Sequence, residues 1–375
     1  MRKLRFIWIV LFAITLANAC SRMGGQTAAL NIYIRLPEEV TTKVGASEWP
    51  SILAKEKRIN DLKIWVFVNQ YADSSVPAGA LLGYLEPKQL NVADGDVQVF
   101  TLPMDKEKAS KLQKVDVFVL ANSKAVQLME LGEEATRTQL DTLCLSDNRF
   151  GILSTGAPTD ARVEETEGLP YCAVGKGLEL SGPATNLTVK NVELVRAVSK
   201  IQFVFEQGND TPDDFTITGL ELKGSQIPKR EYLFNDSNNS YKIDEKSGYV
   251  DQAAIFTSYL PAKTSIARSK SPGNYIYTGG STATYQNRIY SALANGFLTG
   301  CPPFYLRESD KTLSGIIRYQ IGSESKSLEF NMADKEQFTR NSNWILYFYF
   351  NSTTMGLGVF YSEWGSDGPY TIIGN

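Results

Sequence analysis

The side chains that could do chemistry in this 375-residue chain are four cysteines, a few adjacent carboxylates and the lysines, because the sequence contains no histidine. Histidine is the commonest general base near neutral pH and the commonest metal ligand. Its absence excludes Ser-His-Asp and Cys-His catalysis and the usual zinc sites. We therefore expect a protein that is not an enzyme, with no catalytic residue, no metal site and no cofactor.

Adjacent carboxylates such as Glu133-Glu134, Glu164-Glu165 and Asp213-Asp214 remain as candidates for acid-base or calcium chemistry. Adjacent side chains point in different directions in a helix or a strand. Glycosidase carboxylates need a separation of about 5–10 Å that only the fold can set. A calcium loop built on Asp210 and its neighbours would lack the spaced ligands and central glycine of an EF-hand. Solvated loop charge is the preferred interpretation.

Cys20 follows an export signal with three parts. Basic residues open the chain, an apolar run covers 6–16, and the small residues 17–19 precede the cysteine. The apolar run is shorter than the roughly 20 residues of a spanning helix. The arrangement resembles a bacterial lipobox, in which the cysteine is acylated, except that Ala17 stands where such boxes usually have leucine. We predict a signal peptide over 1–19 and lipidation of Cys20, for example by palmitate; an unmodified secreted thiol is the alternative.

The other cysteines are Cys144, Cys172 and Cys301. This is an odd set for an oxidising compartment. A disulfide between Cys144 and Cys172 is one interpretation. The other is three buried thiols, because cysteine packs well as a small apolar residue.

Short strands separated by turns must position these residues. The composition is that of a globular protein, with 43% hydrophobic and 21% charged residues, and the length suggests two domains. After a tether over 20–27, we expect an N-terminal domain over 28–184 and a C-terminal domain over 185–375, divided at the turn-rich stretch 181–186. The fold class is mainly β, with two antiparallel β-sandwich domains and short helices in the first, at 104–113, 123–131 and 137–145.

Two strands stand out. In the first, Leu30, Ile32, Ile34 and Leu36 alternate with more polar residues, which predicts a strand with one buried face. Pro37 ends it, and a long loop follows over 38–57. In the second, at 344–350, both faces are apolar, so this strand must be central or covered. A longer strand is expected at 192–206.

The order of these segments resembles the fimbrial subunits (fimbrillins, type V pili) of Bacteroidales bacteria. The matching stretches cover almost the whole mature chain: Cys20, the alternating strand to Leu36, LKIWVFV at 62–68, VDVFVLANS at 115–123, VELVRAVSKIQF around Arg196, FTITGLELKG followed by YLF, TRNSNWILYFYF with Arg340-Asn341, and GLGVFYSEW ending at Trp364.

This resemblance implies two transthyretin-like sandwiches and a role as a structural subunit of a cell-surface fimbria. In that family an outer-membrane lipoprotein precursor is cut by an Arg-specific protease in the loop after the first strand. The strand leaves, and its groove accepts a C-terminal strand of the next subunit. Here the loop 38–57 has no arginine, so the cleavage candidates are Arg58 and Arg35, with Lys43 a third if the protease is not Arg-specific. The stretch 370–373 is the candidate donor strand.

Two further interpretations stay open. A subunit that keeps its first strand would be a non-polymerising anchor or tip. A glycan-binding outer-membrane lipoprotein would need an exposed aromatic row, for which the candidates are Tyr275, Tyr277, Tyr285, Tyr290 and Tyr305. Lysine and arginine number 38 against 41 acidic residues, with no basic block, so nucleic acid is not an expected partner.

Overall fold

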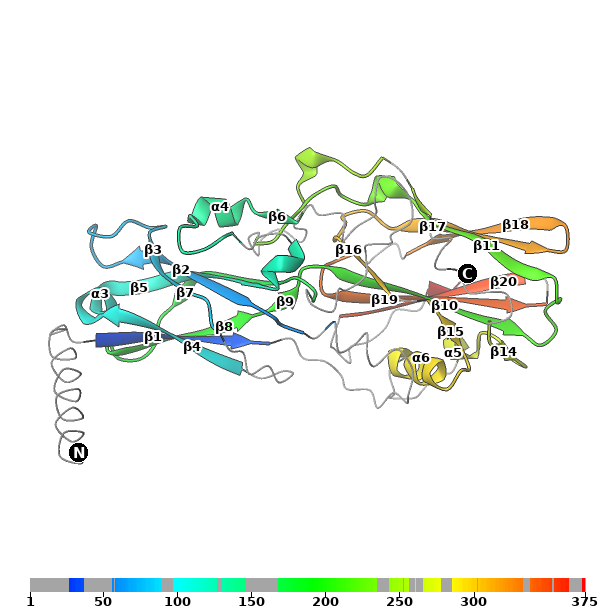
Figure 1. Ribbon diagram of the computed structural model, residues 1–375, viewed down its shortest axis with the longest axis horizontal. Helices are drawn as coiled ribbons and strands as arrows, with labels where there is room; N and C mark the ends of the chain where they lie inside the picture. The colour runs from blue at the N-terminus through cyan, green and yellow to red at the C-terminus, as the bar shows by residue number, and fades with distance from the viewer. Residues whose placement is uncertain are drawn as a thin grey trace, which may run out of the picture.

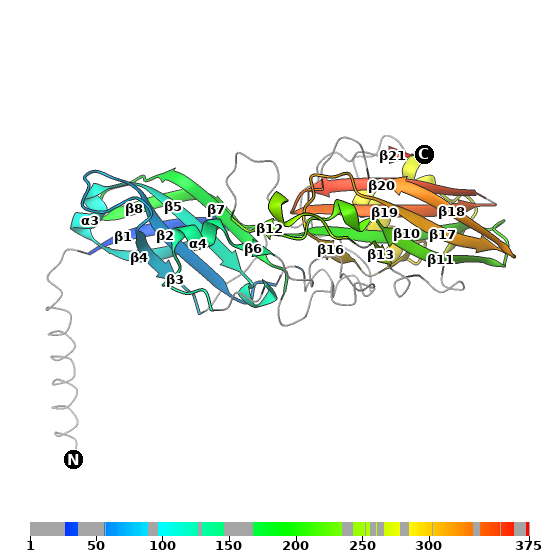
Figure 2. The same cartoon turned by 90° about the horizontal axis from the view of Figure 1, so that it is seen from above.

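Strands dominate the computed structural model and gather into two lobes that lie end to end (Figures 1 and 2). The structure describes residues 27–36, 56, 58–88, 97–126, 130–145, 168–234, 243–251, 253–255, 260, 266–277, 285–301, 303–332, 338–352, 354–363 and 373–374. The expected mainly β fold is confirmed. Within the described ranges, no helix is long and apolar enough to cross a membrane.

The first lobe contains two sheets around one hydrophobic core. One sheet has the order β3-β2-β5-β7-β9 and the other the order β4-β1-β8. Its strands are β1 (Thr27–Arg35), β2 (Leu62–Tyr71), β3 (Leu81–Leu85), β4 (Val97–Asp105), β5 (Leu112–Ala121), β6 (Cys144–Leu145), β7 (Tyr171–Glu179), β8 (Asn186–Glu193) and β9 (Val195–Arg196). Its helices are α3 (Lys106–Lys111), α4 (Arg137–Asp141) and a 3-10 turn at Ser123–Val126.

The second lobe also pairs two sheets, with the orders β14-β10-β19-β20-β21 and β13-β11-β17-β18. β15 and β16 also pair with β10. The strands are β10 (Ser199–Gly208), β11 (Phe215–Leu222), β13 (Ala254–Ile255), β14 (Arg268–Ser269), β15 (Thr299–Gly300), β16 (Phe304–Leu306), β17 (Ser314–Ile321), β18 (Glu324–Asn331), β19 (Ser342–Asn351), β20 (Thr354–Glu363) and β21 (Ile373–Gly374). The helices are α5 (Asn274–Tyr277), α6 (Tyr285–Ala294) and 3-10 turns at Gly224–Gln226 and Glu245–Ser247.

The doubly apolar strand β19 is covered on both faces, as its sequence requires. Its even-numbered side chains over 344–350 belong to the core between the two sheets. Ile345 and Tyr347, on the opposite face, pack with Ile289 and Leu293 of α6 in a second cluster. β19 also lies between β10 and β20, so neither of its edges is open.

The packing changes from one lobe to the other close to residue 200. Val198 still belongs to the first core, whereas Ile201 belongs to the second. β8 and β9 therefore pack with the first lobe. The turn-rich stretch 181–186 is a turn inside that lobe, where Ser181 pairs with Thr188 and Gly182 has a φ of 93°. The two-domain division stays a prediction, and the packing would place its boundary at 198–200 rather than at 184–185.

Several local expectations need correction. The strand expected at 192–206 is divided into the end of β8, β9 and β10. The helix expected at 137–145 ends at Asp141, because Cys144–Leu145 pairs with β12 (Glu231–Tyr232). The helix expected at 104–113 shortens to α3, because β4 extends to Asp105, whose side chain caps the helix. The sheets are also not purely antiparallel, since β1 runs parallel to β8 and β10 parallel to β19.

Candidate functional site

The first strand, β1, buries one face completely. Leu30, Ile32 and Ile34 have no exposed surface, and Leu36 is 4% exposed. All belong to the first-lobe core. Burying one such side chain contributes about 1.5–3 kcal/mol. Any strand that replaced β1 would therefore need large apolar residues at alternate positions.

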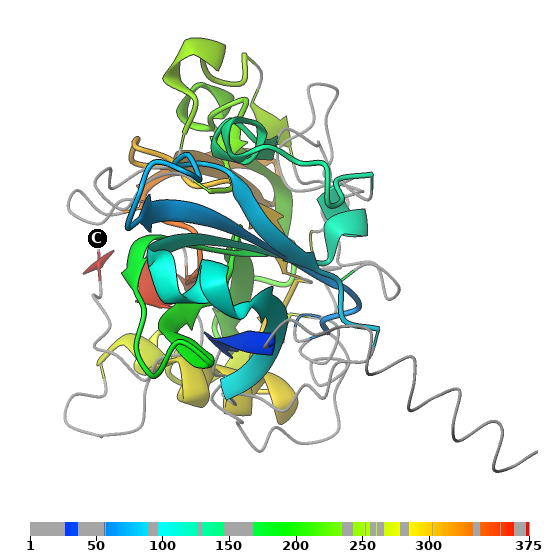
Figure 3. The same ribbon diagram turned by 90° about the vertical axis from the view of Figure 1, so that its left-hand side faces the viewer.

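The backbone of β1 is paired on both edges. It runs antiparallel to β4 along all nine of its residues, from Thr27 opposite Asp105 to Arg35 opposite Val97. On the other side it runs parallel to β8, with a register shift between Ile32 and Ile34. β1 is thus the middle strand of its sheet, and Figure 3 shows it in dark blue below the blue strands β2 and β3. Without β1, the facing edges of β4 and β8 would have no partner.

The opposite face of β1 carries polar contacts that fix its register. Asn31 lies at the centre: its Nδ2 donates to Asn186 Oδ1 at 2.6 Å, and its Oδ1 accepts from Thr101 Oγ1 at 2.8 Å. Lys190 Nζ lies 5.9 Å from the centre of the Tyr33 ring. These contacts reach β4 and β8 at once, so they hold β1 at one position between its neighbours.

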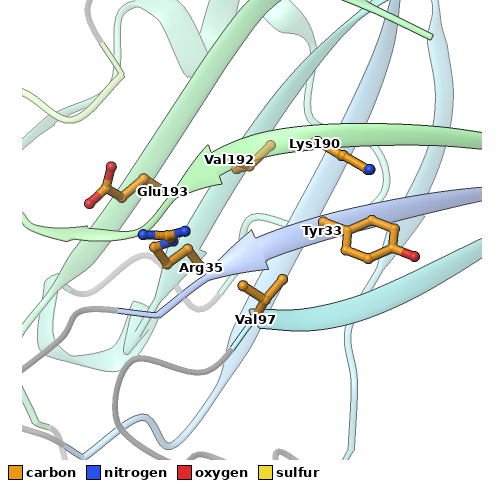
Figure 4. Close-up of a pocket in the computed structure, with 6 residues that line it drawn as sticks. All are labelled: Tyr33, Arg35, Val97, Lys190, Val192 and Glu193. Atoms are coloured by element: carbon orange, nitrogen blue, oxygen red, sulfur yellow. The ribbon is translucent and has the colours of Figure 1, made fainter. Parts of the chain in front are cut away.

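A hollow of about 490 Å³ lies on this face at the end of β1 (Figure 4). It is lined by Tyr33, Arg35, Val97, Lys190, Val192 and Glu193. Figure 4 shows the Arg35 side chain between the ends of β4 and β8, on the outside of the sheet.

Arg35, one of the two predicted cleavage candidates, is exposed at its side chain but held at its backbone. It is the last residue of β1, and its carbonyl oxygen accepts a hydrogen bond from Leu194 N at 2.9 Å. Leu36 after it is buried. A protease that needs an extended, accessible segment would have to pull this end of β1 out of the sheet first. Cys20 and Lys43 lie outside the described residues.

Arg58, the other candidate, is also exposed at its side chain, and its carbonyl is held by Asn122. Asn122 Nδ2 donates to Arg58 O at 2.7 Å and to Leu169 O at 2.6 Å, and its Oδ1 accepts from Asn60 N at 2.7 Å. Gly168 lies against the same carbonyl, since a Cβ there would be 2.8 Å from Arg58 O. The chain on both sides of the bond between Arg58 and Ile59 is therefore fastened to the first lobe.

Glu56 is a functional candidate that sequence reasoning missed. Its side chain has no exposed surface, although it lies in a charged stretch that reads as loop. Lys200 Nζ lies 2.8 Å from its Oε1, and Tyr305 Oη donates to the same oxygen at 2.6 Å. Tyr171 Oη donates to the Glu56 carbonyl oxygen. No periodicity marks this residue, so its burial could not have been read from the sequence.

The Cys144–Cys172 disulfide is not formed, since Cys144, Cys172 and Cys301 are all thiols. Cys144 lies in β6, opposite Tyr232, whereas Cys172 lies in β7, opposite Leu120. The two residues thus belong to different sheets. Burial raises the pKa of the Cys301 thiol to about 12, so this residue stays protonated at neutral pH.

The carboxylate pairs do not assemble into a site. Glu133, Glu134, Asp213 and Asp214 are exposed, and Asp213 pairs with Arg268 at 3.3 Å. In the described part of the chain, no group of three or more residues could hold a metal ion. Glu164-Glu165 lies outside that part.

The aromatic candidates for a glycan platform are mostly core residues where the structure describes them. Tyr290 and Tyr305 are buried, and so are Trp65 and Trp344. Tyr275 packs edge-on against Tyr347. The large hydrophobic residues exposed in the described ranges are Leu81, Val97, Val99 and Phe297. An exposed row of tryptophan or tyrosine is thus absent from the described side chains.

The candidate donor stretch 370–373 overlaps β21 at its end. β21 pairs antiparallel with β20, with Ile373 opposite Val359 and Gly374 opposite Gly358. It lies at the outer edge of the main sheet of the second lobe (Figure 2). The residues 364–372 before it lie outside the described part of the chain.

No family model matches the chain, and no curated protein sequence matches it. Among solved structures, it is similar to a Bacteroides eggerthii protein with a proposed cell adhesion role (14% identity, TM-score 0.46, 91% of this chain and 97% of that one). It is also similar to a Bacteroides thetaiotaomicron protein with proposed polysaccharide binding (11% identity, TM-score 0.42, 92% of this chain and 98% of that one). A third similar structure is the major pilin of Streptococcus pyogenes (7% identity, TM-score 0.20, 88% of this chain and 100% of that one). Its structural neighbours thus include proteins described as cell adhesion or polysaccharide-binding proteins of Bacteroides and a pilin, all at low identity.

Proposed function

We propose that the chain is a structural subunit of a cell-surface fimbria that is exported as a lipoprotein through Cys20. A protease removes β1, and the groove between β4 and β8 then takes up the C-terminal strand of the next subunit. The residues of 370–373 supply that strand. Because the donor and the groove are different surfaces, the contact repeats from one subunit to the next and builds an open filament.

The observation that carries this proposal is the position of β1. An N-terminal strand lies in the middle of a sheet, with both edges paired and four large aliphatic side chains buried. Losing it would expose two sheet edges and a row of apolar pockets at once. Such a groove binds an extended strand through backbone hydrogen bonds and selects its register through alternate side chains.

Cleavage at Arg58 fits this proposal better than cleavage at Arg35. A cut after Arg35 would leave Leu36 in the core and in the mature subunit. A cut after Arg58 would release β1 with the whole segment that follows it. The second lobe would keep its own strand pairings. β2 would also stay paired with β5, because that pairing begins at Leu62, after the cut.

A non-polymerising anchor is the second candidate. The hydrogen bonds between Asn122 and the chain on both sides of the Arg58–Ile59 bond favour a subunit that is cut slowly or not at all. Such a subunit would keep its own first strand and its lipid. It would still offer a C-terminal strand to a neighbour.

The test compares three purified chains without the signal peptide. One starts at Ser21, one starts at Ile59, and the third starts at Ile59 and lacks 364–375. We expect the first chain to stay monomeric, the second to form a ladder of oligomers, and the third to stay monomeric, as measured by size-exclusion chromatography with light scattering. If the second chain stays monomeric at high concentration, polymerisation is contradicted and the non-polymerising anchor is the remaining candidate.

A peptide with the sequence of residues 27–36 provides the control. It should bind the chain that starts at Ile59 and stop its oligomerisation. The Ile32→Asp peptide should fail, because a charge would enter the core. The Tyr33→Ser peptide should still bind, because Tyr33 lies on the outer face of the strand. Equal behaviour of the two altered peptides would show that the groove of β1 is not the binding site.

A further inference from the structure

Glu56 connects the two lobes through buried contacts. Its carbonyl oxygen accepts from Tyr171 of β7, which belongs to the first lobe. Its carboxylate contacts Lys200 of β10, at 2.8 Å and 3.0 Å from its two oxygens, and Tyr305 of β16. β10 and β16 pair with each other in the second lobe. The backbone of Glu56 thus contacts a strand of the first lobe, and its side chain contacts two strands of the second lobe, at the place where the packing changes.

The charge of Lys200 is the reason why this carboxylate matters. Lys200 is 2% exposed, and its ammonium group also lies 5.8 Å from the centre of the Tyr290 ring. Burial by itself would lower the pKa of Lys200, but the Glu56 carboxylate and, after it, Tyr290 together raise this pKa above its ordinary value. A buried cation that loses its paired anion is strongly unfavourable. The junction therefore depends on a carboxylate at this position.

The place of Glu56 in the chain is equally informative. It comes two residues before Arg58 and belongs to the segment that a cut at Arg58 would release. Resting on the proposed processing, we propose that Lys200 and Tyr305 form a carboxylate-binding site between the lobes. Glu56, whose backbone carbonyl accepts from Tyr171, fills this site in the uncut chain, and cleavage at Arg58 empties it. A cut at Arg35 leaves Glu56 joined to β2 and the site filled.

The consequence is that the position of the cut sets the stiffness of the subunit. With Glu56 in place, the lobes are held by an ion pair that is shielded from water. Once Glu56 leaves, either Lys200 must bind another carboxylate or water must enter the junction and solvate its ammonium group. The site takes carboxylates as a class, since one ammonium and one phenol donate to the same group.

The first test uses the uncut chain and does not depend on processing. Glu56→Gln should lower Tm by on the order of 5 °C, because Lys200 stays buried opposite a neutral amide. The double variant Glu56→Gln, Lys200→Met should recover most of this loss. Glu107→Gln breaks an exposed ion pair with Lys111 and should leave Tm unchanged. Equal Tm values for the parent and Glu56→Gln would contradict the proposal that the junction depends on a carboxylate at this position.

The ligand class is tested by rescue with sodium acetate. In Glu56→Gly, acetate should raise Tm more than sodium chloride at the same concentration, because it can occupy the vacated position. Adding Lys200→Met should abolish the difference. A rise in Tm that persists in the double variant would be a general salt effect and would contradict a carboxylate site.

The second test moves the cut. Two chains carry a site for a specific protease, one at Lys43 and one directly after Arg58, and both are cut after folding. Hydrogen exchange at 199–201 and 304–306 should become faster after the second cut only. Equal exchange in both cut chains would overturn the effect on the junction. Faster exchange without oligomers would instead keep the carboxylate site and count against the proposed polymerisation.

Discussion

Asn122 shows how a single residue can protect a cleavage candidate. It is fully buried, adopts a φ of 57°, and is hydrogen-bonded to the backbone on both sides of the Arg58–Ile59 bond. Asparagine tolerates this left-handed conformation better than most residues. Asparagine therefore suits the backbone conformation at this position, and its side chain holds the segment between Arg58 and Asn60 against the first lobe.

We predict that Asn122→Ala speeds trypsin cleavage after Arg58. The variant loses three hydrogen bonds and places alanine at positive φ, which together should lower the free energy of unfolding by about 2–4 kcal/mol. The rate is measured by N-terminal sequencing of products that begin at Ile59. Asn122→Gly removes the same hydrogen bonds without the backbone strain and should also be cut faster. Parent-like rates in both variants would show that Asn122 does not protect this bond.

Two strands that carry large apolar side chains play different roles because of what surrounds them. β1 is apolar on one face, and β19 is apolar on both. The outer face of β1 carries Asn31 and Tyr33, which are partly exposed. The second face of β19 is covered by α6, so β19 is a fixed part of the core. Of these two strands, only β1 could be withdrawn without unthreading other strands, because no described strand precedes it.

We predict that α6 stabilises the second lobe through its contact with β19. Ile289→Ala should lower the free energy of unfolding by about 2–4 kcal/mol, because it leaves a cavity against Ile345 and Tyr347. Denaturant unfolding followed by fluorescence measures the change. Ser291→Ala, at an exposed position of the same helix, should change it by less than about 0.5 kcal/mol. Similar losses in both variants would mean that the helix itself, rather than this contact, is affected.

At the scale of the whole molecule, two distant sequence segments meet where the lobes join. Arg196 N donates to Asn341 Oδ1 at 3.4 Å, and Asn341 N donates to Val198 O at 3.0 Å. Arg340 donates to Leu233 O at 3.0 Å and to Cys172 Sγ at 3.3 Å. The stretches around Arg196 and Arg340-Asn341 therefore build the junction between the lobes.

This junction should make stability depend on pH. Burial, together with the nearby Glu308 and against the attraction of Arg340, raises the pKa of Glu231 to about 8. The folded chain then keeps a proton that the unfolded chain loses above its ordinary pKa of 4.5. The contribution is present below pH 4.5 and is lost as pH rises to about 8, with a slope of at most about 1.4 kcal/mol per pH unit.

The measurement is denaturant unfolding of the parent chain and of Glu231→Gln between pH 5 and 8. The parent should lose stability across this range, and the variant should show a flatter profile. Glu107→Gln, at an exposed position, should follow the parent. A parent profile without a slope would place the pKa of Glu231 near its ordinary value, as expected if Arg340 outweighs burial.

The sequence by itself determined the strands whose patterns are strong. The alternating residues 30–36 lie in β1 or directly after it, and the strand expected at 344–350 lies within β19, which is longer by two residues at its start and by one at its end. Periodicity records burial directly, so it located these strands. It missed α6, and it missed β18, which is mostly exposed and lacks an alternating apolar pattern.

Only the tertiary structure decided how the segments are used. Periodicity predicted one buried face for β1, but pairing placed it between β4 and β8, which makes its removal consequential. Both cleavage candidates, Arg35 and Arg58, were found as residue types, whereas their backbone restraints come from Leu194 and Asn122, which are distant in the chain. The burial of Glu56 depends on contacts across more than a hundred residues, and no local pattern carries that information.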